Sequence, residues 1–284
     1  MNIKVARQVG YCYGVERALN LAFEAAKSHP GPIYTLGPII HNPQVVESLM
    51  KQAIHVAFSP DEVREGTIII RSHGVDPRII TAAKERGLEV LDATCPFVKK
   101  AQKMASSLNK EGYHVVIVGE RNHPEVLSIL AHAGEYALVA EKGEDLSFLP
   151  RGIHKVGVVV QTTQSVEKLE EIVSRLLNRI SELKVYNTIC HATTQRQKEA
   201  EALTRKVDVM LVVGGKNSAN TTRLAQICRA TGTSTYHVET ASEIDPTWFK
   251  SNSRVGVTTG TSTSQWILRE VVDFLEQIAG RKGA

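Results

Sequence analysis

Short runs of apolar residues alternate with amphipathic stretches along the whole chain. The apolar runs predict buried strands at 33–36, 67–70, 88–91, 114–118, 156–160, 209–213 and 255–258, and a further strand running into Cys190. Helical spacing of apolar residues predicts helices at 15–27, 45–50, 79–86, 98–109, 126–132, 166–180, 195–205, 222–230 and 265–278. Strands that alternate with helices in this way indicate an α/β fold with parallel sheets.

Three cysteines occupy equivalent places in this pattern. Cys12, Cys95 and Cys190 each follow a strand pattern and precede a helix, with 83 residues from the first to the second and 95 from the second to the third. The repeat predicts three similar lobes. We expect them at 13–95, 96–189 and 190–284, with residues 1–12 adding a strand to the third. Since ligands bind at the carboxyl ends of parallel strands, the polar turns of the three lobes are expected to meet at one centre.

The composition is that of an ordinary globular protein. The 284 residues carry a net charge of +4 without a basic stripe, so nucleic-acid binding is not expected. No apolar run approaches the roughly 18 residues that span a membrane, and the first residues lack the apolar core of a signal peptide. A cytoplasmic protein is therefore expected, in which cysteines are catalytic, metal-bound or buried rather than paired in disulfides.

The cysteine spacing favours a metal site over redox motifs. None of the four cysteines forms a C-x-x-C pair, so zinc ribbons and thioredoxin-type motifs are not supported. A structural zinc site needs four protein ligands, whereas three thiolates leave a vacancy. An iron-sulfur cube with three cysteine-bound irons and one open iron fits that count. Any one cysteine also fits simple burial, and Cys228, inside a predicted helix, is assigned to the core.

Polar residues on the other turns suit an anionic ligand. Three histidines follow strands, and hydroxyl or amide side chains follow others. These residues are His41, His73, His123, Thr162, Ser218, Asn220 and Ser262. Neutral or weakly cationic donors beside helix N-termini suit a phosphate or diphosphate. The alternative remains that the Ser, Thr and Asn residues only cap helices.

Glu125 is the most informative carboxylate, because it follows His123 and a proline in the first turn of a helix. An acid is favourable there for its interaction with the helix dipole alone. Beside a metal cluster, however, a carboxylate with a histidine and a threonine hydroxyl can protonate a leaving hydroxide.

Eight motifs along the chain, in the same order, resemble the 4-hydroxy-3-methylbut-2-enyl diphosphate reductase family. They are Gly10–Ala18, His41–Asn42, Ser72–Val75, Asp92–Val98, His123–Val126, Gln161–Thr163, Ile189–Gln197 and Lys216–Asn220. The resemblance extends from about residue 3 to residue 278. Two positions depart from the family pattern: Ala219 stands where many members have serine, and Ser264 where members commonly have proline.

The resemblance implies three lobes with pseudo-threefold symmetry around a central 4Fe-4S cluster bound by Cys12, Cys95 and Cys190. The open iron would bind the allylic hydroxyl of the substrate. Two electrons and two protons would then remove this hydroxyl as water, giving isopentenyl and dimethylallyl diphosphate in the last step of the non-mevalonate isoprenoid pathway.

The resemblance also assigns residues and a partner. Glu125 would supply the proton, while His123 and Thr162 would orient the hydroxyl. The diphosphate would be bound by His41, His73, Ser218, Asn220, Ser262 and, through its backbone N–H, Ala219. Electrons would come from a ferredoxin or flavodoxin, since no G-x-G-x-x-G fingerprint is present. A monomer is expected.

Two other functions remain as alternatives. A non-catalytic metal or iron-sulfur sensor, or an anion-binding protein, would need the cysteines but not Glu125 or the phosphate donors. A cluster-dependent hydratase of carboxylic acids would be expected to carry arginines on the turns, where this chain has His, Ser and Asn.

Overall fold

The computed structural model describes residues 1–283 and divides into two compact units. The first unit contains residues 1–15, 41–45 and the chain from 191 onward, and the second contains 16–40 and 46–190. Among the described residues, no helix has both the length and the apolar character needed to cross a membrane.

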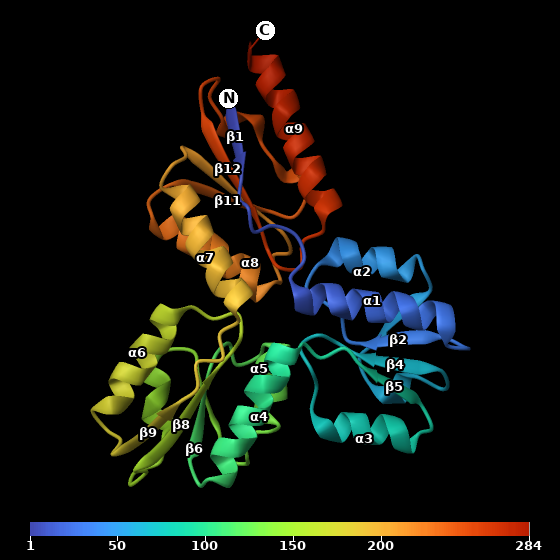
Figure 1. Ribbon diagram of the computed structural model, residues 1–284, viewed down its shortest axis with the longest axis vertical. Helices are drawn as coiled ribbons and strands as arrows, with labels where there is room; N and C mark the ends of the chain where they lie inside the picture. Colours follow the sequence, from blue (N-terminus) through green and yellow to red (C-terminus); the bar gives the residue numbers. More distant parts are fainter. Residues whose placement is uncertain (284) are drawn as a thin grey trace. The chain divides into compact units, whose positions relative to one another are not determined.

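The first unit contains one four-stranded parallel sheet with helices on both faces (Figure 1). Its strands lie in the order β1 (Asn2–Val5), β12 (Arg254–Thr259), β10 (Val209–Val213) and β11 (Ser234–Val238). Helix α9 (Gln265–Gly283) packs Ile267, Val271 and Leu275 on one face. On the other face, α7 (His191–Thr204) and α8 (Ala219–Ala230) form a separate core. Strand β1 thus pairs with the last strand of the chain.

The second unit contains two sheets, of which the first is formed by residues 33–92. Its parallel strands lie in the order β3 (Ile54–Ala57), β2 (Ile33–Leu36), β4 (Thr67–Ile70) and β5 (Glu89–Asp92). Helix α3 (Pro77–Glu85) covers one face, and α1 (Tyr13–Ser28) and α2 (Pro43–Met50) cover the other (Figure 1). Ile68 and Ile70 of the central strand are fully buried in the core under α3.

The other sheet of the second unit is formed by residues 114–185. Its parallel strands lie in the order β7 (Leu138–Ala140), β6 (His114–Val118), β8 (Lys155–Val160) and β9 (Glu182–Val185). Helices α4 (Pro96–Lys110) and α5 (Pro124–Leu130) cover one face, and α6 (Val166–Leu177) covers the other.

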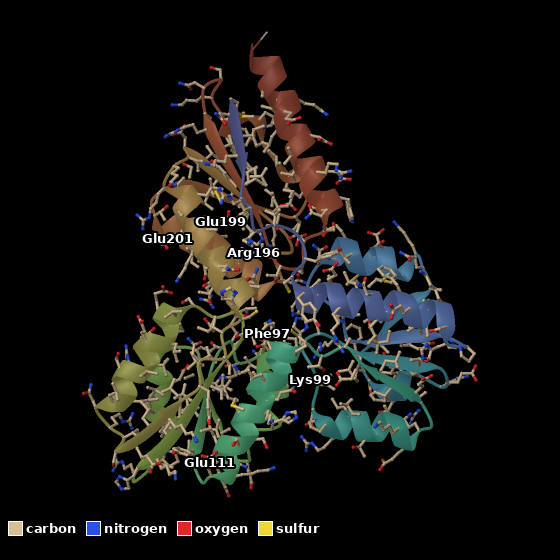
Figure 2. The ribbon with its side chains drawn as sticks, in the orientation of Figure 1. Phe97, Lys99, Glu111, Arg196, Glu199 and Glu201 are labelled. Carbon is tan, nitrogen blue, oxygen red and sulfur yellow. The ribbon has the colours of Figure 1, made fainter. Side chains whose placement is uncertain are left out.

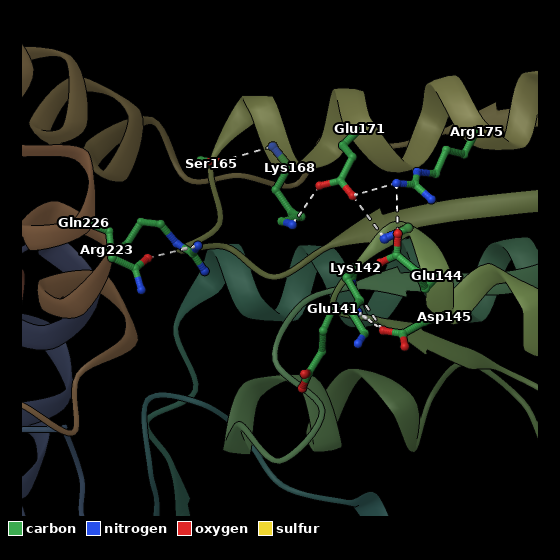
Figure 3. A network of polar contacts seen from close by, with 11 residues as sticks. Glu141, Lys142, Glu144, Asp145, Ser165, Lys168, Glu171, Arg175, Arg223 and Gln226 are labelled. Atoms are coloured by element: carbon green, nitrogen blue, oxygen red, sulfur yellow. Dashed lines mark hydrogen bonds and ion pairs between the residues drawn. The ribbon is translucent and has the colours of Figure 1, made fainter. Parts of the chain in front are cut away.

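A polar network ties the loop after β7 to α6 (Figure 3). Glu171 accepts hydrogen bonds from Lys168 Nζ at 2.8 Å and from the backbone N–H of Gly143 at 3.1 Å. Arg175 pairs with Glu144 at 3.1 Å. These contacts join the loop that follows the carboxyl end of the edge strand β7 to α6.

The prediction of an α/β fold with parallel sheets is confirmed. Each sheet falls within one of the three predicted segments, whereas the lobe boundaries themselves stay a prediction. The sequence pattern missed the edge strands β3, β7 and β11, which are short or polar. It also placed the starts of α7 and α8 too late, because both helices begin with polar first turns that lack apolar periodicity.

Candidate functional site

The three cysteines have the same backbone environment in all three sheets. Each is partly exposed and lies in the turn that follows an edge strand, and its N–H donates to a carbonyl in the turn after the neighbouring strand. The pairs are Cys12 with Thr261 (3.1 Å), Cys95 with Ser72 (2.9 Å) and Cys190 with Thr162 (2.9 Å). The repeat predicted from sequence is therefore a repeat of local structure. The turns lie at the strand ends where parallel sheets bind ligands.

Cys228 differs from these three cysteines. It lies on α8, is fully buried, and packs in the core with Met210 and Leu224. Burial raises the pKa of its thiol. Its assignment to the core is confirmed.

Prolines fix the backbone of two candidate site residues. Pro96 and Pro124 occupy the first turns of α4 and α5, where a missing N–H costs no helical hydrogen bond. A residue before proline is restricted to extended conformations, and Cys95 and His123 have ψ angles of 135° and 133°. Both side chains are thereby set at the helix starts by the sequence itself.

His123 caps α5 through its ring. Its Nδ1 accepts a hydrogen bond from the N–H of Glu125 at 3.1 Å. An accepting Nδ1 leaves the ring proton on Nε2, so the neutral ring presents a donor there. The ring of His73 meets it edge to face, with centroids 5.5 Å apart and an interplanar angle of 84°. The second unit thus brings these two predicted histidines together.

Glu125 is buried against Thr162. One carboxylate oxygen accepts from the N–H of Thr162 at 2.6 Å and the other from its hydroxyl at 2.9 Å, and the residue is 2 % exposed. Desolvation raises the pKa of Glu125 to about 7, although both hydrogen bonds from Thr162 oppose the rise. A carboxyl group with this pKa is present in both protonation states near neutral pH, as a proton donor requires.

The raised pKa of Glu125 is expected to make stability fall as pH rises. Between pH 4.5 and about 7 the folded chain keeps this proton while the unfolded chain loses it, so the free energy of unfolding decreases across that window. The total loss expected at this one group is about 3 kcal/mol. Urea denaturation at about pH 5 and about pH 8 measures it. In Glu125→Gln the free energy of unfolding should not show this fall with pH, whereas the control Glu170→Gln, at an exposed site, should still show it. An equal change of the free energy of unfolding with pH in both variants would contradict the raised pKa.

In the first unit, three polar turns lie together. The hydroxyl of Ser262 donates to the carbonyl of His41 at 3.1 Å. That carbonyl also approaches Gly215 so closely that a Cβ there would lie 2.7 Å from it. Ser218 caps α8 by accepting from the N–H of Thr221 at 3.4 Å. The turns at 41–42, 214–220 and 260–264 therefore form one polar cluster.

This cluster contains buried polar atoms without a hydrogen-bond partner among the described residues. They include Nδ2 and Oδ1 of Asn220 and Nδ2 of Asn42, and Oγ1 of the adjoining Thr221 is unpaired in the same way. Asn220 is 2 % exposed and Thr221 is fully buried. A buried polar atom left unpaired costs about 1–3 kcal/mol, so native proteins pair such atoms with water or a ligand. The amide and hydroxyl donors, beside the start of α8, suit an anion.

The predicted site residues thus fall into two sets. The second unit contains His73, His123, Glu125, Thr162, Cys95 and Cys190, and the first contains Cys12, His41, Ser218, Ala219, Asn220 and Ser262. Within each set, turns distant in sequence contact one another. That both sets serve one site stays a prediction.

Sequence reasoning gave no role to two arginines that contact the cysteine loops. Arg196 lies on α7 (Figure 2) and donates to backbone carbonyls near Cys12. Arg17 lies on α1 and donates to carbonyls just before Cys95. Their partners are distant in sequence. The available signals were that each arginine lies five or six residues after a cysteine and falls within one of the family motifs.

Comparison with known proteins gives consistent results. The model of the LytB protein family matches residues 3–276. The 4-hydroxy-3-methylbut-2-enyl diphosphate reductase of Pelobacter propionicus is 50 % identical over 278 residues, covering 98 % of this chain and 99 % of the relative. The enzyme of the same name from Geobacter sulfurreducens is 49 % identical over 282 residues, covering 99 % of both.

Two solved structures are also similar. One is of (E)-4-hydroxy-3-methyl-but-2-enyl diphosphate reductase, described as the terminal enzyme of the non-mevalonate pathway, with 43 % identity, a TM-score of 0.73, and coverage of 97 % of this chain and 99 % of that one. The other is of E-1-hydroxy-2-methyl-but-2-enyl-4-diphosphate reductase from Plasmodium falciparum. It has 28 % identity and a TM-score of 0.91, and the match covers 97 % of this chain and 87 % of that one.

Proposed function

The chain belongs to the LytB protein family, and on that premise we propose that it reduces (E)-4-hydroxy-3-methylbut-2-enyl diphosphate. In this reaction the allylic C–O bond breaks, two electrons and two protons are taken up, and water leaves. The products are isopentenyl and dimethylallyl diphosphate, which end the non-mevalonate pathway. The structural observation that carries the proposal is the buried Glu125, whose pKa of about 7 suits protonation of a leaving hydroxide.

The donor set of the three equivalent turns fits a 4Fe-4S cluster. Cys12, Cys95 and Cys190 offer three partly exposed thiols, whereas a structural zinc site would need a fourth ligand. These residues would bind the cluster, which when bound supplies a Lewis-acidic iron and a route for electrons.

The second unit provides the groups that handle the proton. Glu125 supplies it, and the hydroxyl of Thr162, bonded to Glu125 at 2.9 Å, lies where it can orient an alcohol oxygen. His123 presents the proton of Nε2 as a further donor. His73 and the polar cluster of the first unit bind the diphosphate, through His41, Ser218, Asn220, Ser262 and the N–H of Ala219.

A negative charge at position 220 should block diphosphate binding. Asn220→Asp is expected to raise KM at least about a hundredfold, because a carboxylate beside the diphosphate is repulsive and accepts rather than donates hydrogen bonds. The matched control is Asn217→Asp in the same turn, where residue 217 is exposed. Isothermal titration with inorganic diphosphate measures the same loss without turnover. Equal affinity in the two variants would contradict the assignment.

We also propose a ferredoxin or flavodoxin as electron donor, a monomeric state and a cytoplasmic location. Support for the location is the set of four cysteines, which form no disulfide among the described residues, as suits a reducing compartment. A protein as electron donor, rather than a bound nicotinamide or flavin dinucleotide, is supported by the lack of a G-x-G-x-x-G motif in the sequence.

Anaerobic turnover tests the proposed function. The chain, purified without oxygen and supplied with a reduced ferredoxin, should convert the allylic alcohol diphosphate to the two product isomers, as measured by mass spectrometry. Oxidation of the donor should match product at about two electrons per molecule, as the stoichiometry requires. A cluster-loaded chain that forms no product would favour the non-catalytic sensor instead.

A further inference from the structure

Arg196 is a buried arginine whose partners are mainly backbone carbonyls. It is 4 % exposed, and its Nη1 donates to the carbonyls of Thr259 (2.8 Å) and Gly260 (2.9 Å) and to Oγ1 of Thr259 (3.1 Å). Its Nη2 donates to the carbonyl of Gly10 at 3.0 Å. A buried guanidinium is costly unless its donors are satisfied, and here Nη1 and Nη2 are bonded while Nε has no partner among the described residues.

These contacts join the loop that leads to Cys12 with the turn that leads to Ser262. The N–H of Gly10 donates to the same Thr259 hydroxyl that accepts from Arg196. Gly10 has a φ of +80°, a backbone conformation that strongly favours glycine. Two residues later, the N–H of Cys12 donates to the carbonyl of Thr261.

Glu199 holds the same loop one helical turn further along α7 (Figure 2). Its two carboxylate oxygens accept from the N–H groups of Arg7 (2.6 Å) and Gln8 (2.7 Å). Burial lowers the pKa of Arg196, and the negative charge of Glu199 only partly opposes this shift. The segment from Arg7 to Gly10 is therefore bound to α7 by the carboxylate of Glu199 and the guanidinium of Arg196, three residues apart on the helix.

Arg17 repeats this arrangement in the second unit. It lies on α1, the helix after Cys12, and donates to the carbonyls of Asp92 (3.3 Å) and Thr94 (3.4 Å), just before Cys95. Arg196 lies on α7, the helix after Cys190, and bonds the loop before Cys12. In both cases the helix that follows one cysteine contacts the backbone that leads to another.

We propose that Arg196 and Arg17 are positioning residues that fix the backbone leading into Cys12 and Cys95. Neither side chain needs to touch substrate, because each acts through the loop it bonds. The inference rests on the proposed function in one respect: the loops must be fixed because their cysteines are cluster ligands. Rigid ligand loops preorganise a metal site and slow the loss of the metal.

Hydrogen exchange of the anaerobically purified full-length chain tests the proposal. In Arg196→Gln, the amides of Gly10 and Cys12 are expected to exchange at least about tenfold faster, because Gly10 and the Thr259–Thr261 turn lose a shared donor. In Arg196→Lys the same two amides should also exchange faster, since a single ammonium cannot reproduce the several hydrogen bonds of the planar guanidinium. In Arg17→Gln the increase should appear at Thr94 and Cys95 instead. The control for Arg196→Gln is Arg205→Gln, which removes an exposed arginine directly after the end of α7. The control for Arg17→Gln is Lys27→Gln on α1.

A second measurement reports on the metal site. Iron release to a chelator is expected to be about tenfold faster in Arg196→Gln and Arg17→Gln than in the controls. Glu199→Gln should speed exchange at Arg7 and Gln8, with Glu201→Gln as its control on the same helix. Should Arg196→Gln fail to fold, Arg196→Lys and Glu199→Gln still decide the question.

Wild-type exchange rates at Gly10 and Cys12 in Arg196→Lys would overturn the proposal. So would faster exchange spread over the whole unit, since that indicates general destabilisation rather than positioning. The exchange measurement needs no substrate. A wild-type chain that fails in the turnover assay would therefore refute the proposed function without changing the exchange result.

Discussion

Replacing Glu125 with glutamine is expected to lower kcat about a thousandfold and to leave KM within about twofold, because removal of a general acid acts on the chemical step. Glutamine has nearly the same shape and remains buried, but it cannot release a proton. The measurement is anaerobic turnover with saturating substrate and reductant. The control is Glu135→Gln, an exposed glutamate of the same unit.

The pH profile separates this role from a structural one. Since the pKa of Glu125 is raised to about 7, the protonated fraction falls above that pH, and wild-type kcat/KM should fall about tenfold per pH unit there. The residual activity of Glu125→Gln should lack this fall. A variant that keeps the wild-type rate, or one that keeps the alkaline fall, would show that another group donates the proton.

The sequence predicts the strand order along the chain well, because the central strands are buried on both faces. Val209–Val213 and Thr67–Ile70 are buried along their whole length, so their apolar runs are continuous. The edge strands β3, β7 and β11 were missed for the opposite reason. Strand β11, Ser234–Val238, is only partly buried and mostly polar, and β7 is three residues long.

Site chemistry was predictable where it depends on local sequence and not where it depends on packing. The proline after His123 fixes the histidine at the start of α5, and this geometry can be predicted from the dipeptide. The pKa of Glu125 depends on burial and on Thr162, 37 residues away in sequence. The role of Arg196 depends on Gly10, which is 186 residues away. Neither of these partners can be identified from spacing in one sequence.

Serine at any one of the three turn cysteines is expected to abolish cluster binding and activity. A hydroxyl is protonated at neutral pH and binds iron far more weakly than a thiolate, so iron should fall from about four per chain to below about one. Turnover should fall at least about a thousandfold, since Lewis-acid and electron-transfer chemistry are lost together. Iron and sulfide analysis with Mössbauer spectroscopy measures the first effect, and product formation the second.

The chain provides its own control for this experiment. Cys228→Ser makes the same substitution in the fully buried core of the first unit, at a position that is not in a strand-end turn. It should keep the iron content and the spectrum of the wild type, at some cost in stability, because a buried hydroxyl is less favourable than a thiol. Since Cys12, Cys95 and Cys190 share one backbone environment, their three variants should behave alike. If the chain kept four irons after serine replaced any one of these three cysteines, a cluster bound by their thiolates would be contradicted. Stoichiometric zinc in the wild type would contradict it as well.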